Sequence, residues 1–188
     1  MHIISGAFRG KRLWTPRGQT TRPTSAKVKE AIFQILSDDV VGAIGLDLFA
    51  GCGGLGLEAL SRGAEEMIFV EHGKTAAKIL RKNLTALGCT DRGRVVQEHV
   101  LRFLRKPTLR ENSFDLIFAD PPYRRDLLKN TLTMISDRDL LSGQGILVAE
   151  RWKKDVLPEC IGSLRCFLER TYGDTSVSFW RKKQGKDS

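Results

Sequence analysis

Hydrophobic residues in this chain fall into short continuous runs, separated by segments in which they recur at helical spacing. The continuous runs predict strands buried on both faces of a sheet; they lie at residues 44–49, 67–71, 94–98, 114–119 and 146–150. The periodic segments predict helices, which lie at residues 55–62, 75–87, 100–105 and 126–135. Regular alternation of strand and helix is typical of an α/β fold with a mostly parallel sheet covered on both faces.

The two ends of the chain follow different patterns. Two apolar pairs, at 3–4 and 13–14, flank a glycine-punctuated stretch and predict a short N-terminal hairpin. A helix then runs from Thr24 or Ser25, either of which can cap it, to about Ser37. Segments 166–172 and 176–181 predict a closing antiparallel pair. We therefore expect a basic arm over residues 1–22, one domain over 23–183 and a polar tail over 184–188.

Composition narrows the class of protein. The chain has 188 residues, of which 41% are hydrophobic and 28% charged, as in a globular domain. It has no apolar run of the roughly 20 residues that a membrane span needs, and its start lacks the pattern of a signal peptide, so we expect a cytoplasmic protein. Four scattered cysteines and three dispersed histidines predict neither a disulfide framework nor a metal site.

Positive charge is concentrated at the ends of the chain. The net charge is +9; residues 1–30 carry seven basic side chains and one acidic one, and residues 151–188 carry nine basic and five acidic ones. The region between them holds 15 basic and 16 acidic residues and is close to neutral. Segregated basic charge favours a polyanionic partner such as nucleic acid, although a basic surface can also bind nothing.

A glycine-rich turn follows the first strand, and an acidic residue ends the second. Gly51 and Gly53 allow the backbone to approach a ligand closely, and Glu71 can accept both hydroxyls of a ribose. The spacing also fits a dinucleotide site. However, Asp47 precedes the glycines, where its charge opposes a pyrophosphate but suits the cationic groups of S-adenosylmethionine. The loop therefore favours S-adenosylmethionine.

The segment Asp120-Pro121-Pro122-Tyr123 follows the fourth strand. Two prolines remove two N–H donors and leave a cluster of acceptors, which suits an exocyclic amine of a nucleobase. Two acceptors on its hydrogens, the Asp120 carboxylate and the Pro121 carbonyl, favour a pyramidal nitrogen with a directed lone pair. Tyr123 offers a face on which an unstacked base can lie. The pattern predicts an amino-methyltransferase with Asp120, Pro121 and Tyr123 in the catalytic site.

These motifs make the chain resemble class I S-adenosylmethionine-dependent methyltransferases, and more narrowly the bacterial 16S ribosomal RNA guanine-N2 methyltransferase family. The resemblance covers nearly the whole chain. The matching motifs are Ile3-Ile4-Ser5-Gly6, Arg9-Gly10, Thr21-Arg22-Pro23-Thr24, residues 47–53, residues 58–64, Glu71, residues 120–123 and residues 172–175.

The resemblance implies a Rossmann-like, seven-stranded sheet with an antiparallel C-terminal strand. It implies that Arg22, Pro23 and Thr24 border the methionine end of the cofactor, that Asp47 and Gly51 line it, and that Glu71 holds its ribose. It further implies an N-terminal arm that binds RNA, through Arg9, Lys11, Arg12 and Arg17. The expected partner is 16S ribosomal RNA or the assembling 30S subunit, and the expected protein is a monomer that needs neither metal nor membrane.

The sequence departs from the family at two positions. His99 stands where related enzymes place Asp or Asn near the adenine, and it is either a cofactor contact or a surface residue. Cys52 replaces a common Ser, and we interpret it as a packing residue.

Other functions stay open at this point. Asp-Pro-Pro-Tyr also serves adenine-N6 methylation of DNA or RNA and amide methylation of protein, although DNA enzymes usually carry a recognition domain for which this chain is too short. Outside methyl transfer, the alternatives are an NAD-dependent oxidoreductase, for which hydride-transfer residues are lacking, and a catalytically silent RNA-binding module.

Overall fold

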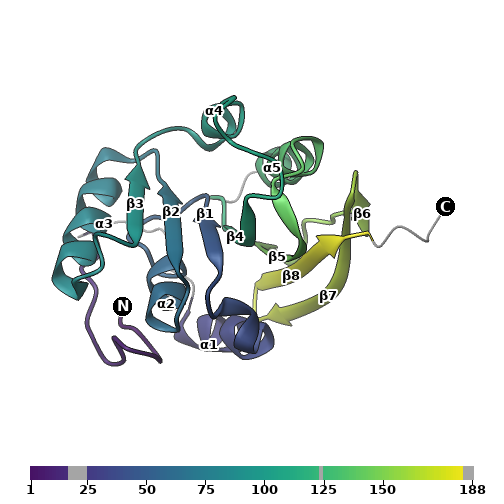
Figure 1. Ribbon diagram of the computed structural model, residues 1–188. Helices are drawn as coiled ribbons and strands as arrows, with labels where there is room; N and C mark the ends of the chain where they lie inside the picture. Colours follow the sequence, from purple (N-terminus) through teal and green to yellow (C-terminus); the bar gives the residue numbers. More distant parts are fainter. Residues whose placement is uncertain (17–24, 123–124, 184–188) are drawn as a thin grey trace.

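A computed structural model describes residues 1–16, 25–122 and 125–183. Within them, eight strands form one mixed sheet in the order β3-β2-β1-β4-β5-β8-β7-β6 (Figure 1). The strands are β1 (Ile44–Asp47), β2 (Glu66–Val70), β3 (Gly93–Val96), β4 (Phe114–Ala119), β5 (Leu141–Trp152), β6 (Cys160–Ile161), β7 (Leu164–Tyr172) and β8 (Thr175–Lys182). The helices are α1 (Ala26–Leu36), α2 (Gly56–Ser61), α3 (Lys74–Leu87), α4 (Val100–Leu104) and α5 (Arg125–Asp137), with a 3-10 turn η1 (Ser37–Val40) after α1.

The first five strands are parallel, and the last three are antiparallel to their neighbours. The chain fills the sheet from β1 outward to β3, then returns to the other side of β1 with β4 and β5. The direction of winding therefore reverses between β1 and β4. In open α/β sheets, ligands bind in the crevice beyond the carboxyl ends of the strands at such a reversal.

Helices cover both faces of the sheet, as the alternating pattern predicts. Side chains of α1, α2 and α3 pack in one hydrophobic cluster, together with Ile3 and Leu13 of the N-terminal segment. Side chains of α4 and α5 pack in a second cluster on the opposite face. The Ser25 side chain caps α1, accepting a hydrogen bond from the N–H of Val28. None of the helices in the described ranges is long and apolar enough to cross a membrane.

Two strands differ most from the sequence-based expectation; the others agree with it to within two residues at each end. The sheet has eight strands rather than seven, because Cys160–Ile161 pairs with β7; two residues are too few to show alternation. Strand β5 begins at Leu141 rather than at Ile146. Its first part contains Gly143 and Gly145, which are typical of a loop, and the register against β4 shifts between Phe114 and Leu116 to accommodate the irregularity.

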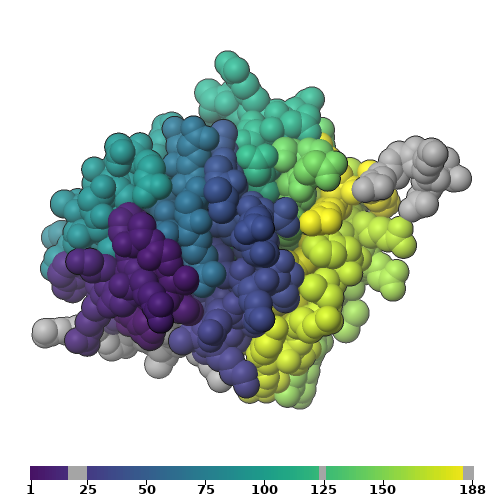
Figure 2. Space-filling view, turned by 60° about the horizontal axis from the view of Figure 1, so that its bottom comes forward, coloured from purple at the N-terminus to yellow at the C-terminus, as the bar shows by residue number. Residues whose placement is uncertain are grey.

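Residues 1–16, called the arm from here on, form a loop closed by one antiparallel bridge between His2 and Arg12, rather than a regular two-stranded hairpin. The N–H of Ile3 donates to the carbonyl of Lys11, and that of Leu13 donates to the carbonyl of Met1. The arm lies against the body as a compact patch (Figure 2). The predicted boundary at residue 22 and the tail over 184–188 lie outside the described residues.

Candidate active site

The glycine turn lies directly beyond the carboxyl end of β1. Gly51 and Gly53 have positive φ angles of 54° and 92°, which side chains other than glycine rarely adopt. A Cβ on Gly53 would lie 2.5 Å from Leu80 and 2.7 Å from Leu57, so this glycine lets the turn pack against α2 and α3. A Cβ on Gly51 would meet nothing within 4 Å. The backbone at Gly51 is therefore open to a ligand.

Glu71, the residue after β2, links the glycine turn to the start of α3. One carboxylate oxygen accepts the N–H of Gly51 at 2.8 Å, and the other accepts the N–H of Gly73 at 2.5 Å. Each carboxylate oxygen has lone pairs for further donors. Glu71 thus fixes the shape of the turn and still presents acceptors to hydroxyl groups of a ligand.

Asp47 ends β1 and is 3% exposed. Its Oδ2 accepts the N–H of Gly56, the first residue of α2, at 3.0 Å. Burial raises the pKa of Asp47 to about 7, helped by the negative charges of Asp120 and Glu71 and opposed by the Gly56 hydrogen bond. Asp47 at the end of β1, Glu71 after β2 and Asp120 after β4 therefore interact electrostatically in one corner, called the acidic corner from here on. Such a corner stabilises a positively charged ligand group.

The register of the sheet explains how Asp120 reaches this corner. Asp47 pairs with Phe118 of β4, and Asp120 follows two residues later at the same edge of the sheet. Asp120 is half-buried and Pro121 is buried. The structure therefore places the Asp-Pro-Pro turn beside the glycine loop. Tyr123 lies outside the described residues, as do Arg17, Arg22, Pro23 and Thr24.

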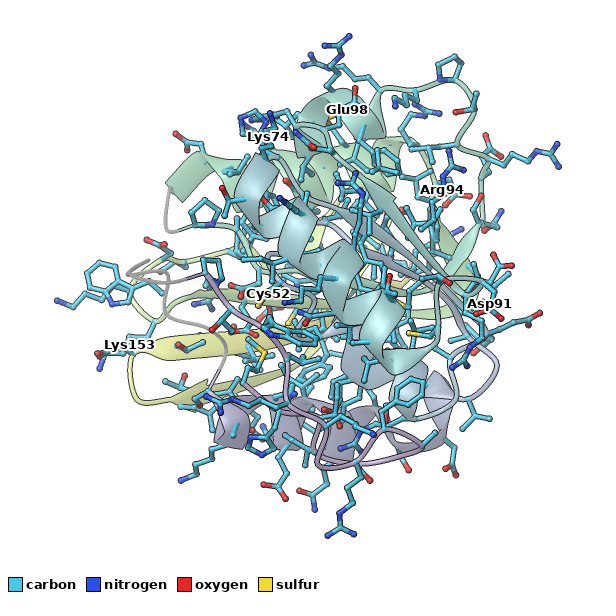
Figure 3. The ribbon with its side chains drawn as sticks, turned by 90° about the vertical axis from the view of Figure 1, so that its left-hand side faces the viewer. Cys52, Lys74, Asp91, Arg94, Glu98 and Lys153 are labelled. Carbon is cyan, nitrogen blue, oxygen red and sulfur yellow. The ribbon has the colours of Figure 1, made fainter. Side chains whose placement is uncertain are left out.

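His99 lies at the same edge of the sheet, just before α4, and is exposed. Its ring contacts that of His72, with centroids 5.7 Å apart. His72 directly follows Glu71. Glu98, the residue before His99, donates its N–H to the carbonyl of Glu71. In Figure 3, Glu98 and Lys74 lie at the same end of the molecule, away from Asp91. His99 thus borders the acidic corner from the surface.

Cys52 lies within the glycine turn and is buried. Burial raises the pKa of its thiol, so the sulfur stays protonated near neutral pH. A protonated thiol is a weak nucleophile, and this agrees with the interpretation of Cys52 as a packing residue.

The arm carries exposed basic side chains and is anchored by Glu58 and Ser61, which the sequence analysis includes in a family motif without assigning them a role. Arg9, Lys11 and Arg12 are all exposed. The carboxylate of Glu58, which is fully buried in α2, accepts the N–H groups of Ile4 and Ser5 at 2.8 and 2.9 Å. The only signal for this anchor is an acidic residue inside an otherwise apolar helix, which indicates a buried partner.

Gly6 and Ser61 extend the attachment of the arm. The Ser61 hydroxyl accepts the N–H of Phe8 at 2.9 Å, and its backbone carbonyl accepts the N–H of Ala7. Gly6 has a φ of 83°, and a Cβ there would overlap the Ser61 carbonyl. Only glycine therefore permits this close approach between the arm and α2.

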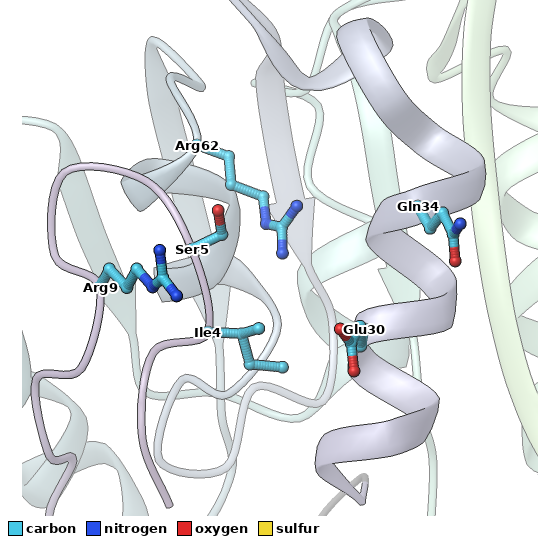
Figure 4. Close-up of a pocket in the computed structure, with 6 residues that line it drawn as sticks. All are labelled: Ile4, Ser5, Arg9, Glu30, Gln34 and Arg62. Carbon is cyan, nitrogen blue, oxygen red and sulfur yellow. The ribbon is translucent and has the colours of Figure 1, made fainter.

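A cavity of about 430 Å³ separates the arm from α1 (Figure 4). Arg9 and Arg62 lie on one side and Glu30 and Gln34 of α1 on the other. The Arg62 guanidinium donates to Glu58 at 3.0 Å and lies over the ring of Phe33. The cavity therefore presents both hydrogen-bond donors and acceptors, and the exposed Arg9 of the arm forms part of its lining.

The winding reversal, the glycine turn and the carboxylates after successive strands define a class I S-adenosylmethionine-dependent methyltransferase. The profile of the family described as conserved hypothetical protein 95 matches residues 1–181. The chain belongs to this family, which also includes proteins named ribosomal RNA small subunit methyltransferase D.

Individual relatives are similar over the full length. The chain is 42% identical to Bacillus subtilis YlbH, named as a candidate rRNA methyltransferase, over 97% of this chain and 100% of YlbH. It is 33% identical to ribosomal RNA small subunit methyltransferase D of Escherichia coli, over 99% of this chain and 92% of that protein. A solved Escherichia coli structure, described as a candidate methyltransferase yhhF, superposes with a TM-score of 0.87 at 32% identity, covering 97% and 98% of the two chains.

Proposed function

We propose that this protein transfers a methyl group from S-adenosylmethionine to the exocyclic N2 of a guanine in 16S ribosomal RNA. The observation that carries the proposal is the acidic corner, in which Asp47, Glu71 and Asp120 interact beside a glycine turn with an open backbone. Relatives named for small-subunit rRNA methylation, similar over 81% to 99% of this chain, supply the substrate class.

The residues of the corner fit S-adenosylmethionine, which supplies a methyl group bound to a positively charged sulfur. Glu71 accepts hydrogen bonds from the ribose hydroxyls, because its oxygens retain lone pairs while the Gly51 and Gly73 amides hold the carboxylate. Asp47 stabilises the positive charge of the methionine part. A pyrophosphate would face both carboxylates at this turn, so the corner favours S-adenosylmethionine over a dinucleotide.

Other residues complete the proposed binding site. Gly51 and Gly53 give the cofactor close access to the backbone, and Arg22, Pro23 and Thr24 border its methionine end. His99 contacts the adenine edge, since it borders the corner next to the Glu71 segment.

Asp120 and the Pro121 carbonyl handle the amine. Both accept hydrogen bonds from the hydrogens of the amine. The nitrogen then becomes pyramidal, and its lone pair points out of the plane of the base. Asp120 also takes the proton that the nitrogen loses when its new bond to carbon forms. Tyr123 stacks on the base, which must leave its helix to reach the corner. Rate enhancement then comes mainly from positioning.

The basic arm binds the RNA in this proposal. Arg9, Lys11 and Arg12 are exposed on a segment that Glu58 and Ser61 hold in place, and Arg17 continues the same basic stretch. Their positive charges contact phosphates, which gives affinity that falls with rising salt.

Isotope transfer tests the proposal. The purified protein is incubated with methyl-labelled S-adenosylmethionine and with 16S rRNA or 30S particles from cells that lack the modification. We expect label in N2-methylguanosine after digestion to nucleosides, and a rate of labelling lower by about 100-fold or more with Asp120→Ala. Label in N6-methyladenosine or in protein would support the alternative amino-methyltransferase activities, and no incorporation into either substrate would contradict the proposal.

A further inference from the structure

Trp14, near the end of the arm, combines an exposed side chain with a fixed backbone. The residue is 45% exposed, whereas Trp180 is buried. Its N–H donates to Oδ1 of Asn83 at 2.9 Å, and its carbonyl accepts from Nδ2 of Asn83 at 3.1 Å. Asn83, in α3, is fully buried. A buried amide thus holds both polar groups of the Trp14 backbone, although nearly half of the residue is exposed.

The same asparagine joins Trp14 to the glycine turn. Nδ2 of Asn83 also donates to the carbonyl of Cys52 at 2.9 Å. One buried side chain therefore fixes the distance between Trp14 and the loop that borders the acidic corner. Loss of any of these bonds would leave a buried polar group without its partner, so the arrangement is held firmly.

A cation lies over one face of the exposed indole, and two more cationic residues precede it on the arm. The ammonium group of Lys82, one residue before Asn83, lies 4.1 Å from the centroid of the Trp14 ring. Lys11 and Arg12 precede Trp14 on the arm and are exposed. In Figure 2 the arm lies on the surface, where a long polyanion can reach it. An aromatic face among cations is the arrangement with which proteins bind unpaired nucleotides.

We propose that Trp14 is a stacking platform for an unpaired base of the RNA substrate, outside the base that is methylated, with Lys82 contacting the adjoining phosphate. This inference rests on the proposed function, because it takes RNA as the substrate. Because the two hydrogen bonds from Asn83 fix the Trp14 backbone before RNA binds, stacking costs little conformational entropy. The fixed distance to the glycine turn makes the platform a positioning device that sets which nucleotide reaches Asp120.

Tryptophan fluorescence provides a direct test. The chain has three tryptophans, and the difference between the wild type and Trp14→Phe isolates the signal of Trp14. We expect a short single-stranded RNA of mixed sequence to quench this signal, and the matching duplex to leave it unchanged. Equal quenching by both RNAs, or none by either, would overturn the proposal.

Affinity measurements separate stacking from charge. Trp14→Ala should weaken binding of the single strand by about 5- to 150-fold, the range for loss of one stacked base, while Trp14→Phe restores most of it. Trp14→Ala should leave the salt dependence unchanged, whereas Lys82→Ala should reduce its slope by about 1. A changed slope in Trp14→Ala without rescue by phenylalanine would assign Trp14 a purely structural role.

Phe167 offers a matched control. It is also 45% exposed and lies beneath the guanidinium of Arg181, 4.7 Å from its ring, but on β7. Phe167→Ala should leave RNA affinity unchanged. If the wild type methylates rRNA and Trp14→Ala does so with an unchanged KM, the platform is refuted and the proposed function stands. If RNA quenches Trp14 but no methyl group is transferred, the proposed function fails and the platform stands.

Discussion

Nζ of Lys29 lies 2.9 Å from Oε2 of Glu58, and the two side chains are 2% and 0% exposed. The pair joins α1 to α2 and also holds the arm, because Lys29 donates to the carbonyl of His2 at 2.8 Å while Glu58 accepts the N–H groups of Ile4 and Ser5. Burial opposes ionisation of Glu58, but these N–H groups and the charges of Lys29 and Arg62 outweigh it and lower its pKa. Glu58 is thus the one buried carboxylate among several groups that hold the arm, which also include Ser61 and Asn83.

We expect Glu58→Gln to loosen the arm at Ile4 and Ser5 and to reduce the free energy of unfolding by about 3 kcal/mol or more, because it leaves the Lys29 charge buried without its partner. Urea unfolding measures the free energy of unfolding. Hydrogen exchange at the amides of Ile4 and Ser5 measures how firmly the arm is attached. Glu30→Gln, which changes an exposed glutamate of α1, should alter neither. Retained protection at both amides would contradict this role for Glu58.

Asp47 makes the stability of the free protein depend on pH. Its pKa is about 7 in the folded chain and 3.8 without burial, so the folded state binds the proton more tightly. The protonated Asp47 therefore contributes to the free energy of unfolding in full below about pH 4, and this contribution is lost as the pH rises through about 7. We expect Asp47→Asn to stabilise the protein increasingly over this range, by up to about 4 kcal/mol.

Urea unfolding at a series of pH values checks the dependence on Asp47. Asp91→Asn, which removes an exposed aspartate before β3, serves as the matched control. A stability difference between Asp47→Asn and the wild type that stays constant with pH would show that Asp47 remains ionised throughout.

The raised pKa also predicts how the cofactor binds. A cationic ligand stabilises the ionised form of Asp47, so affinity for S-adenosylmethionine should rise as the pH increases through about 7, and binding below that pH should release a proton. Calorimetry in two buffers of different ionisation enthalpy measures the released proton. Asp47→Asn should abolish the release; a proton still released by this variant would assign the titration to another group.

Glu71→Gln tests the link between the second strand and the glycine turn. An amide has one oxygen, so it cannot accept from both Gly51 and Gly73, and its NH₂ group meets one of the two donors. We expect affinity for S-adenosylhomocysteine to fall about 10- to 100-fold, consistent with lost hydrogen bonds to a charged acceptor. Glu66→Gln, at the exposed start of β2, should bind normally in the same titration. Normal binding by Glu71→Gln would remove Glu71 from the cofactor site.

The three carboxylates of the acidic corner could be selected from the sequence, because each one is recognised by its position near the end of its own predicted strand. Asp47 lies within the first predicted strand, Glu71 ends the second and Asp120 follows the fourth, and parallel strands bring such positions to one edge of the sheet. Glu58 and Asn83 gave no comparable signal for the arm, because the groups of the arm that they bind are backbone groups, 54 and 69 positions away. Every residue carries the same backbone groups, so the sequence does not show which of them a buried side chain binds. Only the folded structure shows such contacts.

Asp120 gives a prediction that separates chemistry from structure. Asp120→Ala removes an acceptor for the amine, and we expect turnover to fall by about 100-fold or more while cofactor binding persists. The same change removes a negative charge that raises the pKa of Asp47. Proton release on cofactor binding should therefore move to lower pH in this variant, which confirms that the two carboxylates are neighbours even when no turnover can be measured.

The matched control is Asp126→Asn, which changes an exposed aspartate in the first turn of α5. It lies a few residues beyond the Asp-Pro-Pro turn and should leave both turnover and proton release as in the wild type. Retained turnover in Asp120→Ala would remove this residue from the reaction. Lost turnover with an unshifted proton release would instead place Asp120 away from Asp47, because removal of a nearby charge must change the ionisation of its neighbour.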